Sequence, residues 1–170
     1  MTDISMLIDG QRRAATGGAT FERRNPLDGA VATRAPAATP ADAVAAVEAA
    51  HRAFAAWSAT GPNERRAALL KAAHALEARA DAFVQAMARE TGASALWAGF
   101  NVHLAAGILT EAASLTTQIA GEVIPSDVPG SLAMGVRQAA GVVIGIAPWN
   151  APVILATRAI ATPLACGNTV

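Results

Sequence analysis

The clearest structural signal in the chain lies at residues 141–152, which read Gly141-Val142-Val143-Ile144-Gly145-Ile146-Ala147-Pro148-Trp149-Asn150-Ala151-Pro152. The β-branched run at 142–144 favours a strand over residues 142–146, and the segment from Ala147 to Asn150 is typical of a turn. The apolar stretch at 152–165 then predicts a helix, and a new apolar start at 168–170 predicts a second strand. This order of elements predicts a parallel sheet and therefore an α/β fold.

The same region allows one alternative, because no charged residue lies between Arg137 and Arg158. Twenty residues are about the length that crosses a bilayer. Two prolines and two glycines interrupt the stretch, however, and both residue types disfavour a continuous helix. We therefore expect a buried strand and a buried helix here, and a transmembrane helix is the less favoured alternative.

Three amphipathic helices are expected upstream. The first begins at Pro40, with Thr39 placed to cap it and Asp42 in its first turn, and ends near Trp57. The second ends at Gly92, and the third runs from about Ser94 to Ala120. Their expected buried positions are Val44, Val47, His51 and Phe54, then Leu69, Leu70, Ala73, Leu76, Ala80, Phe83, Val84 and Met87, then Trp97, Leu104, Ile108, Ala112, Leu115 and Ile119.

Short strands are expected at both ends of this helical region. Three apolar pieces separated by turn residues precede it, at residues 4–8, 20–24 and 31–35. After Gly121 the apolar period changes to two, with Leu132, Met134 and Val136 alternating beyond a turn-rich stretch at 126–130. A two-stranded hairpin is only marginally stable alone, so we expect this one to lie against another sheet or another subunit.

Composition excludes several classes of function. Thirteen Lys and Arg balance thirteen Asp and Glu, and these charges are dispersed, so nucleic acid and anionic membranes are not expected partners. The single cysteine, Cys166, cannot form an internal disulfide, and no His or Cys spacing suggests a metal site. His51, His74 and His103 fall on separate predicted helices. The start lacks the pattern of a secretory signal, which favours a cytoplasmic protein.

Taken without a family, residues 148–150 have a purely structural interpretation. Asn150 would cap the following helix, Pro148 would shape the turn and Trp149 would fill a gap. The glycines at 141 and 145 do not form a GxGxxG fingerprint, so they do not indicate a dinucleotide site on their own.

Residues 137–152 nevertheless closely resemble the segment that opens the cofactor-binding sheet of aldehyde dehydrogenases, and residues 163–170 resemble the start of its next strand. Residues 92–102 further resemble the salicylaldehyde and vanillin dehydrogenase branch. The resemblance implies the N-terminal part of that fold, with residues 1–120 and 139–170 as a partial NAD(P)-binding domain. It also implies a protruding oligomerisation hairpin at 121–138 and a catalytic domain absent from this chain.

The resemblance also implies roles for individual residues. In this family a cysteine thiolate attacks the aldehyde, hydride passes to NAD(P)+, and a glutamate-activated water hydrolyses the thioester. The side-chain amide of Asn150 would stabilise the developing oxyanion, and residues Ile146, Ala147, Pro148 and Trp149 would lie along the nicotinamide cofactor, with NAD favoured. Arg158 departs from the aromatic residue that is common at its position. It would position a phenolic oxygen while Trp97 packs against the ring; the alternative for Arg158 is a solvated or ion-paired helix residue.

The nucleophile and general base would lie downstream of Val170, and Cys166 does not occupy the nucleophile's position. We therefore expect a fragment of an NAD(P)+-dependent dehydrogenase that oxidises an aromatic aldehyde to the carboxylic acid and forms a homodimer or homotetramer when complete. The alternative is a naturally short, non-catalytic chain that acts through the hairpin as an interaction module.

Overall fold

The structure is a computed structural model that describes residues 2–170. Short strands come first, followed by consecutive helices, a hairpin and a last helix. In chain order the elements are β1 (Thr2–Asp3), β2 (Met6–Ile8), β3 (Gln11–Arg13), β4 (Thr20–Arg24), β5 (Val31–Pro36), α1 (Pro40–Ala59), α2 (Pro62–Glu77), α3 (Ala80–Thr91), α4 (Ala95–Leu115), β6 (Glu122–Ile124), β7 (Ala133–Gly135) and α5 (Pro152–Ala165).

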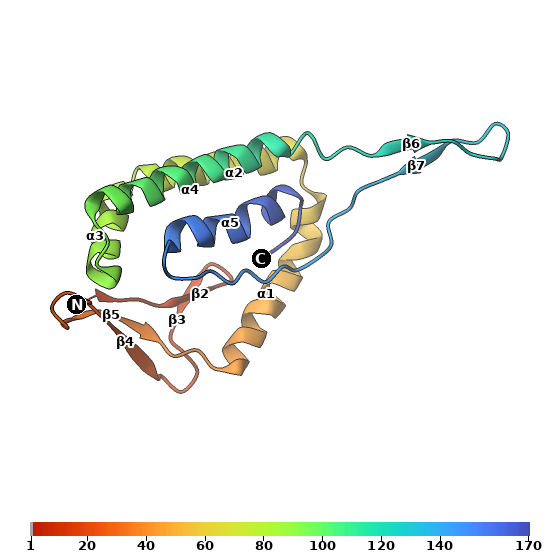
Figure 1. The fold of residues 1–170 in the computed structure, drawn as a ribbon. Coiled ribbons are helices and arrows are strands. Elements are labelled where there is room, and N and C mark those ends of the chain that lie inside the picture. Colours follow the sequence, from red (N-terminus) through yellow and green to blue (C-terminus); the bar gives the residue numbers. More distant parts are fainter. Residues whose placement is uncertain (1) are drawn as a thin grey trace.

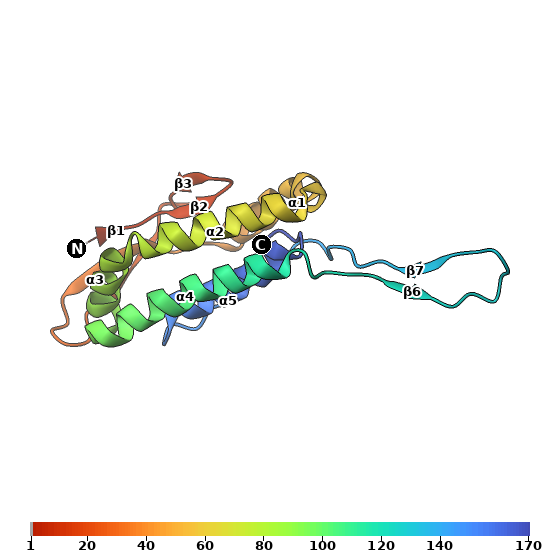
Figure 2. The ribbon, with the colours of Figure 1, turned by 90° about the horizontal axis from the view of Figure 1, so that it is seen from above.

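The helices form a layer in which α4 packs between α2 and α5, and a small sheet of order β1-β5-β4 lies on one side of it (Figures 1 and 2). The core of this layer is built largely from alanine, which lets the helix axes approach closely. Its buried residues are Leu69, Ala73, Ala106, Leu109, Ala112, Ala113, Ala161 and Ala165. The helix α5 that follows Asn150 is therefore fixed to α4 along its length.

Helix α1 begins as expected but buries a different face. Thr39 and Asp42 form a capping box, in which the Thr39 hydroxyl accepts from the Asp42 N–H and the Asp42 carboxylate accepts from the Thr39 N–H at 2.8 Å. The expected buried stripe is wrong, because Val44 and Val47 are exposed while Ala49 is buried. An alanine-rich helix has no face that apolar periodicity marks uniquely, and here the smaller side chains face inward.

The expected second helix is two helices, α2 and α3. The helical path is interrupted at Ala78 and Arg79, where Arg79 has φ −111° and ψ 17°. The Arg79 N–H donates to the Leu76 carbonyl at 3.1 Å, which closes a tight turn. Neither glycine nor proline marks this break, and the apolar spacing continues across it, so the sequence predicted a single helix. The end of α3 is as expected, since Gly92 takes the left-handed conformation with φ 68°.

Helix α4 begins with a Ser94 cap on the Trp97 N–H but ends at Leu115, before the expected Ala120. Three expected core residues, Leu104, Ile108 and Leu115, are only half-buried. The most buried face lies beside them, because α2, α3 and α5 all pack against this helix. That face consists of Ala98, Asn101, Val102, Ala105, Ala106, Leu109, Ala112 and Ala113.

The strand expected at 142–146 forms only at its beginning. Val142 pairs in parallel with Thr169, and the Val143 N–H donates to the Thr169 carbonyl at 2.8 Å. The parallel direction is as expected. Beyond Val143 no described strand lies alongside, so residues 144–146 form no ladder.

The N-terminal strands agree in part with expectation. The strand at 20–24 is β4, and the strand at 31–35 is β5 with one added residue. The piece at 4–8 is a strand only at β2, which pairs antiparallel with β3. Strand β3 was not expected because its sequence, Gln-Arg-Arg, carries no apolar signal.

Strands β6 and β7 form the expected hairpin, which projects far from the helical layer (Figure 2). Glu122 pairs with Gly135, and Leu132, Met134 and Val136 are all exposed. No described element covers either face of this ribbon. Within residues 2–170, no helix combines the length and the hydropathy that crossing a membrane requires.

Candidate functional site

The candidate site is centred on residues 144–150, which link the Val142 bridge to α5. No backbone group in this segment forms a hydrogen bond with another described residue. Its side chains are turned outward, with Ile146 87% and Trp149 66% exposed. Gly145 lies close against α5, because a Cβ at this position would be 3.0 Å from the Ala159 Cβ. The segment therefore follows α5 closely while keeping its backbone groups available.

Asn150 does not cap α5, so the structural interpretation of this residue is wrong. The N-cap is Ala151, and no side-chain hydrogen bond satisfies the first turn of the helix. Asn150 is exposed, and its amide forms no hydrogen bond within residues 2–170. An amide in this state can donate two hydrogen bonds to a ligand.

Helix α5 is held instead at its C-terminal end, by side chains from α1 and α2. The Trp57 Nε1 donates to the Leu164 carbonyl at 3.2 Å, and the Arg65 Nε donates to the Ala165 carbonyl at 3.0 Å. These bonds satisfy carbonyls that have no partner inside the helix, and the guanidinium complements the negative end of the helix dipole. At the start of α5, beside Asn150, no side chain from residues 2–170 forms a corresponding bond.

Trp97 lies in the first turn of α4 and stacks on Phe100, with ring centroids 5.6 Å apart and an interplanar angle of 25°. Trp97 is 43% exposed, so the pair presents an aromatic surface. Helices α4 and α5 run in the same direction, and their first turns lie at the same end of the molecule (Figure 2). Sequence reasoning missed Phe100, although its three-residue spacing from Trp97 was a usable signal.

Arg158 lies on the second turn of α5 and is exposed. No ion pair joins it to any residue between 2 and 170. A solvated side chain and a ligand contact both agree with this geometry. Its position on α5 places it on the helix that follows Asn150.

The other reactive side chains are dispersed. Cys166 is half-buried at the end of α5, away from the start of that helix. In the described part of the chain, no three His, Cys, Asp or Glu side chains gather as metal ligands would. His51 lies on α1, His74 on α2 and His103 on α4.

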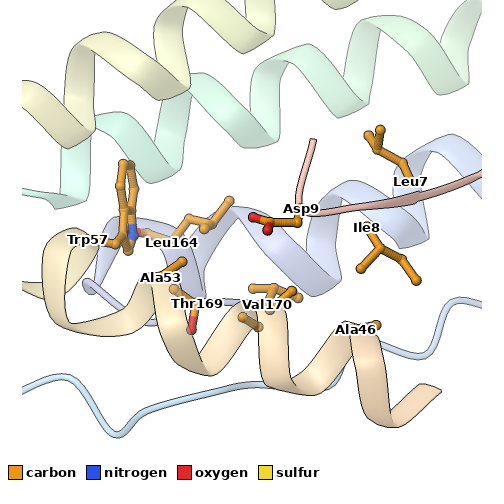
Figure 3. Close-up of a pocket in the computed structure, with 11 residues that line it drawn as sticks. Leu7, Ile8, Asp9, Ala46, Ala53, Trp57, Leu164, Thr169 and Val170 are labelled. Carbon is orange, nitrogen blue, oxygen red and sulfur yellow. The ribbon is translucent and has the colours of Figure 1, made fainter. Parts of the chain in front are cut away.

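One cavity of about 350 Å³ lies between α1, the β2 turn and the end of α5 (Figure 3). Alanines of α1 line one wall, and Ile8, Leu164 and Val170 line the others. Among the residues that line it, Asp9 and Thr169 are the two with a side-chain oxygen, and none has a side-chain amide or a thiol. It also lies at the opposite end of α5 from Asn150, and it is not the candidate site.

Known proteins resemble this chain over its whole length. The sequence profile of the aldehyde dehydrogenase family matches residues 13–170. A vanillin dehydrogenase from Pseudomonas fluorescens is 66% identical over 170 residues, which are 100% of this chain and 35% of that protein. A salicylaldehyde dehydrogenase from Pseudomonas putida is 53% identical over 151 residues, which are 89% of this chain and 31% of that protein. The chain thus spans about a third of the length of these relatives.

Solved structures agree with the sequences. The crystal structure of a salicylaldehyde dehydrogenase from Pseudomonas putida G7, complexed with salicylaldehyde, superposes with a TM-score of 0.98 at 47% identity, covering 100% of this chain and 35% of that one. That of an NAD-dependent benzaldehyde dehydrogenase from Corynebacterium glutamicum superposes with a TM-score of 0.90 at 37% identity, covering 95% and 35%. With the family profile matched from residue 13 onward, the chain belongs to the aldehyde dehydrogenase family.

Proposed function

We propose that the chain is the N-terminal part of an NAD(P)+-dependent dehydrogenase that oxidises an aromatic aldehyde to its carboxylic acid. The observation that carries the proposal is the Asn150 amide, which is exposed and uncommitted where α5 begins. Two relatives whose names specify aromatic aldehydes support the substrate class. In this proposal residues 1–120 and 139–170 belong to the cofactor-binding domain, and residues 121–138 form its oligomerisation hairpin.

Asn150 would act on the aldehyde oxygen. Negative charge develops there when a nucleophile adds to the carbonyl, and a donor already in place stabilises this charge more in the transition state than in the ground state. A side-chain amide suits the task because it donates without a proton that can be lost at working pH. The nucleophile itself would come from outside these residues.

Two features of residues 146–149 support a role in binding a nicotinamide cofactor. Their backbone groups form no hydrogen bonds with the rest of the described chain, and the side chains of Ile146 and Trp149 are largely exposed, so the segment can offer both polar and apolar contacts. When bound, the cofactor would supply the hydride acceptor. We propose NAD+ rather than NADP+, in keeping with the NAD-dependent benzaldehyde dehydrogenase among the solved structures.

The aromatic ring of the substrate would lie against the Trp97 and Phe100 pair. Stacked aromatic side chains offer a flat apolar surface that favours a benzene ring over a short aliphatic chain. Arg158 would then donate to a phenolic oxygen, which a guanidinium does more strongly than a neutral donor.

The test is a spectrophotometric assay of the gene product with benzaldehyde, salicylaldehyde and vanillin, each with NAD+ and NADP+. We expect reduction of the cofactor, and a loss of turnover of roughly a hundred- to a thousandfold in Asn150→Ala. The matched control is Asn63→Ala, an exposed amide near the start of α2. Wild-type turnover in Asn150→Ala would remove the oxyanion role, and a wild-type protein inactive on all three aldehydes would contradict the proposal as a whole.

A second function is favoured by the hairpin alone. Its apolar side chains are exposed on a ribbon that no described element covers, as in a surface for association. In this alternative the chain is an interaction module without catalysis. Self-association of a gene product that oxidises no aldehyde would favour it.

A further inference from the structure

We propose that Asn168 is a positioning residue that sets the place of Asn150 by joining the two ends of one strand-turn-helix unit. The inference rests on the proposed function, because it concerns the site of the same reaction. Asn168 follows the end of α5 and is only 8% exposed. All the hydrogen bonds of its side chain go to the two arms of this unit, residues 140–143 and α5.

The carbonyl of the Asn168 side chain holds the first arm. Its Oδ1 accepts from the Ala140 N–H at 2.7 Å and from the Gly141 N–H at 3.0 Å. The next residue adds to this contact, since the Thr169 N–H donates to the Gly141 carbonyl at 3.2 Å. Residues 140–143 are therefore fixed beside Asn168 before the 144–150 segment begins.

The amide nitrogen of the same side chain holds the second arm. The Asn168 Nδ2 donates to the Pro163 carbonyl at 3.2 Å, and the Asn168 backbone N–H donates to the same oxygen at 3.0 Å. Pro163 lies in the last turn of α5, where carbonyls have no partner within the helix. One carboxamide thus uses its acceptor on one arm and its donor on the other.

This link matters because no hydrogen bond within residues 2–170 holds the segment between the arms. From residue 144 to residue 150 the chain is joined to α5 by its flanks and by the close approach of Gly145 to Ala159. If the first arm slides along α5, the turn that carries Asn150 must move with it. Asn168 closes the open end of the unit, and Asn150 lies at the other end, about 20 Å away along a 14-residue helix.

The asparagine carboxamide meets both demands at this position, whereas aspartate and alanine do not. Aspartate keeps the acceptor for the Ala140 and Gly141 N–H groups but places an oxygen against the Pro163 carbonyl, and alanine loses both functions. The test therefore compares Asn168→Asp and Asn168→Ala in the gene product, with Asn63→Asp and Asn63→Ala as exposed controls. Each is measured for aldehyde turnover per folded protein and for amide hydrogen exchange.

We expect Asn168→Ala to lower turnover by about three- to tenfold, since small misplacements of a reacting group are costly. Asn168→Asp should lower turnover by a smaller factor, and both Asn63 controls should keep wild-type turnover. The deciding measurement is a double-mutant cycle with Asn150→Ala. The effects of substitutions at distant sites normally add. If Asn168→Ala lowers turnover by less than about twofold when Asn150 is already alanine, Asn168 acts through Asn150.

The same loss in both backgrounds would overturn the proposal, because it would indicate a general structural role. Unchanged turnover in both Asn168 variants would overturn it as well. If Asn168→Ala gives no soluble protein, the cycle with Asn168→Asp decides.

Failure of the proposed function has a different signature, which is absence of aldehyde oxidation in the wild-type protein. The contacts of Asn168 with Ala140 and Gly141 are then tested by hydrogen exchange alone. Asn168→Ala must accelerate exchange at the Ala140 and Gly141 amides while the amides of α2 keep their rates. If the Ala140 and Gly141 amides of Asn168→Ala exchange at wild-type rates, Asn168 does not hold this arm.

Discussion

Asp42 connects the start of α1 to the N-terminal loop through an unusually complete set of donors. Its carboxylate accepts from the Thr39 N–H and hydroxyl and from the Thr16 N–H and hydroxyl, with the Thr16 hydroxyl at 2.7 Å. The backbone N–H of Thr39, followed by the hydroxyl of Thr16, lowers the pKa of Asp42 to about 2. The charged form of Asp42 is thus the one that the fold stabilises.

This lowered pKa predicts an acid-dependent contribution to stability. The unfolded chain has an aspartate pKa of about 3.9, so the contribution is fully present above about pH 4 and is lost as the pH falls toward 2. Asp42→Asn should lower the melting temperature at pH 7, and its difference from wild type should narrow between pH 4 and pH 2. Thermal unfolding followed by circular dichroism checks this. The exposed Asp127→Asn is the control, and a difference independent of pH would contradict the assignment.

Arg158 supplies the second prediction at this scale. If its guanidinium contacts a phenolic oxygen, Arg158→Leu should lower kcat/KM for salicylaldehyde by roughly tenfold or more, since a hydrogen bond to a charged group contributes about 1.5–3 kcal/mol. Benzaldehyde, which lacks that oxygen, should lose much less. Steady-state kinetics on both substrates is the measurement, with the exposed Arg12→Leu on β3 as the control. An equal loss on both substrates would count against the contact.

At the level of single residues, the sequence suggested a site through one resemblance and revealed few of the contacts around it. The resemblance of residues 137–152 pointed to Asn150, and the helix signals at Thr39 and Gly92 were confirmed. The partner of Trp97 was missed because a helical Phe is read first as a core residue, whereas Phe100 is 47% exposed. The anchoring bonds of Trp57 and Arg65 connect residues 107 and 100 positions apart, which no local pattern reveals.

Among the elements, the contact between the 144–150 segment and α5 depends on the absence of a side chain at Gly145. A Cβ there would lie 3.0 Å from the Ala159 Cβ, so Gly145→Ala should displace the segment by a few tenths of an ångström. We expect turnover to fall by about two- to tenfold, because a displacement of about 1 Å can cost a hundredfold. The aldehyde assay measures it.

The control for this prediction is Gly107→Ala in α4, where an added Cβ meets nothing within 4 Å. This variant should keep turnover and gain about 0.5–1 kcal/mol of stability, because alanine favours a helix interior over glycine. Wild-type turnover in Gly145→Ala would show that the segment tolerates the displacement.

The elements themselves were predictable where the sequence carries a local cause. Helix α5 has the expected bounds, and its Pro152 fits the first helical turn. The break between α2 and α3 escaped because Ala78 and Arg79 are ordinary helix formers and tertiary packing turns the chain there. The strand at 142–146 is short because a strand requires a neighbour, and hydrogen bonds between strands are set by distant residues.

For the whole molecule, the hairpin is the feature whose role depends most on partners. Strands β6 and β7 project from the end of the helical layer where α4 finishes (Figure 1). Val123 in β6 is exposed, as are Leu132 and Val136, which flank β7. An exposed two-stranded ribbon has unpaired edges and apolar faces that favour pairing with another chain. The homodimer or homotetramer expected from the sequence would therefore assemble through this ribbon.

The geometry at the root of the hairpin offers a direct test of this inference. A Cβ added at Gly121 would overlap the Gly135 carbonyl oxygen across the ribbon, whereas one added at Gly135 would meet only the Glu122 carbonyl oxygen at 4.0 Å. Gly121→Ala should therefore distort the ribbon and shift the protein toward monomer, while Gly135→Ala keeps the wild-type assembly. Analytical ultracentrifugation over a range of protein concentrations measures the difference. The helical core lies away from the hairpin, so Gly121→Ala should lower the melting temperature only as far as the loss of association does. If both variants assemble to the same extent, the hairpin is not part of the interface.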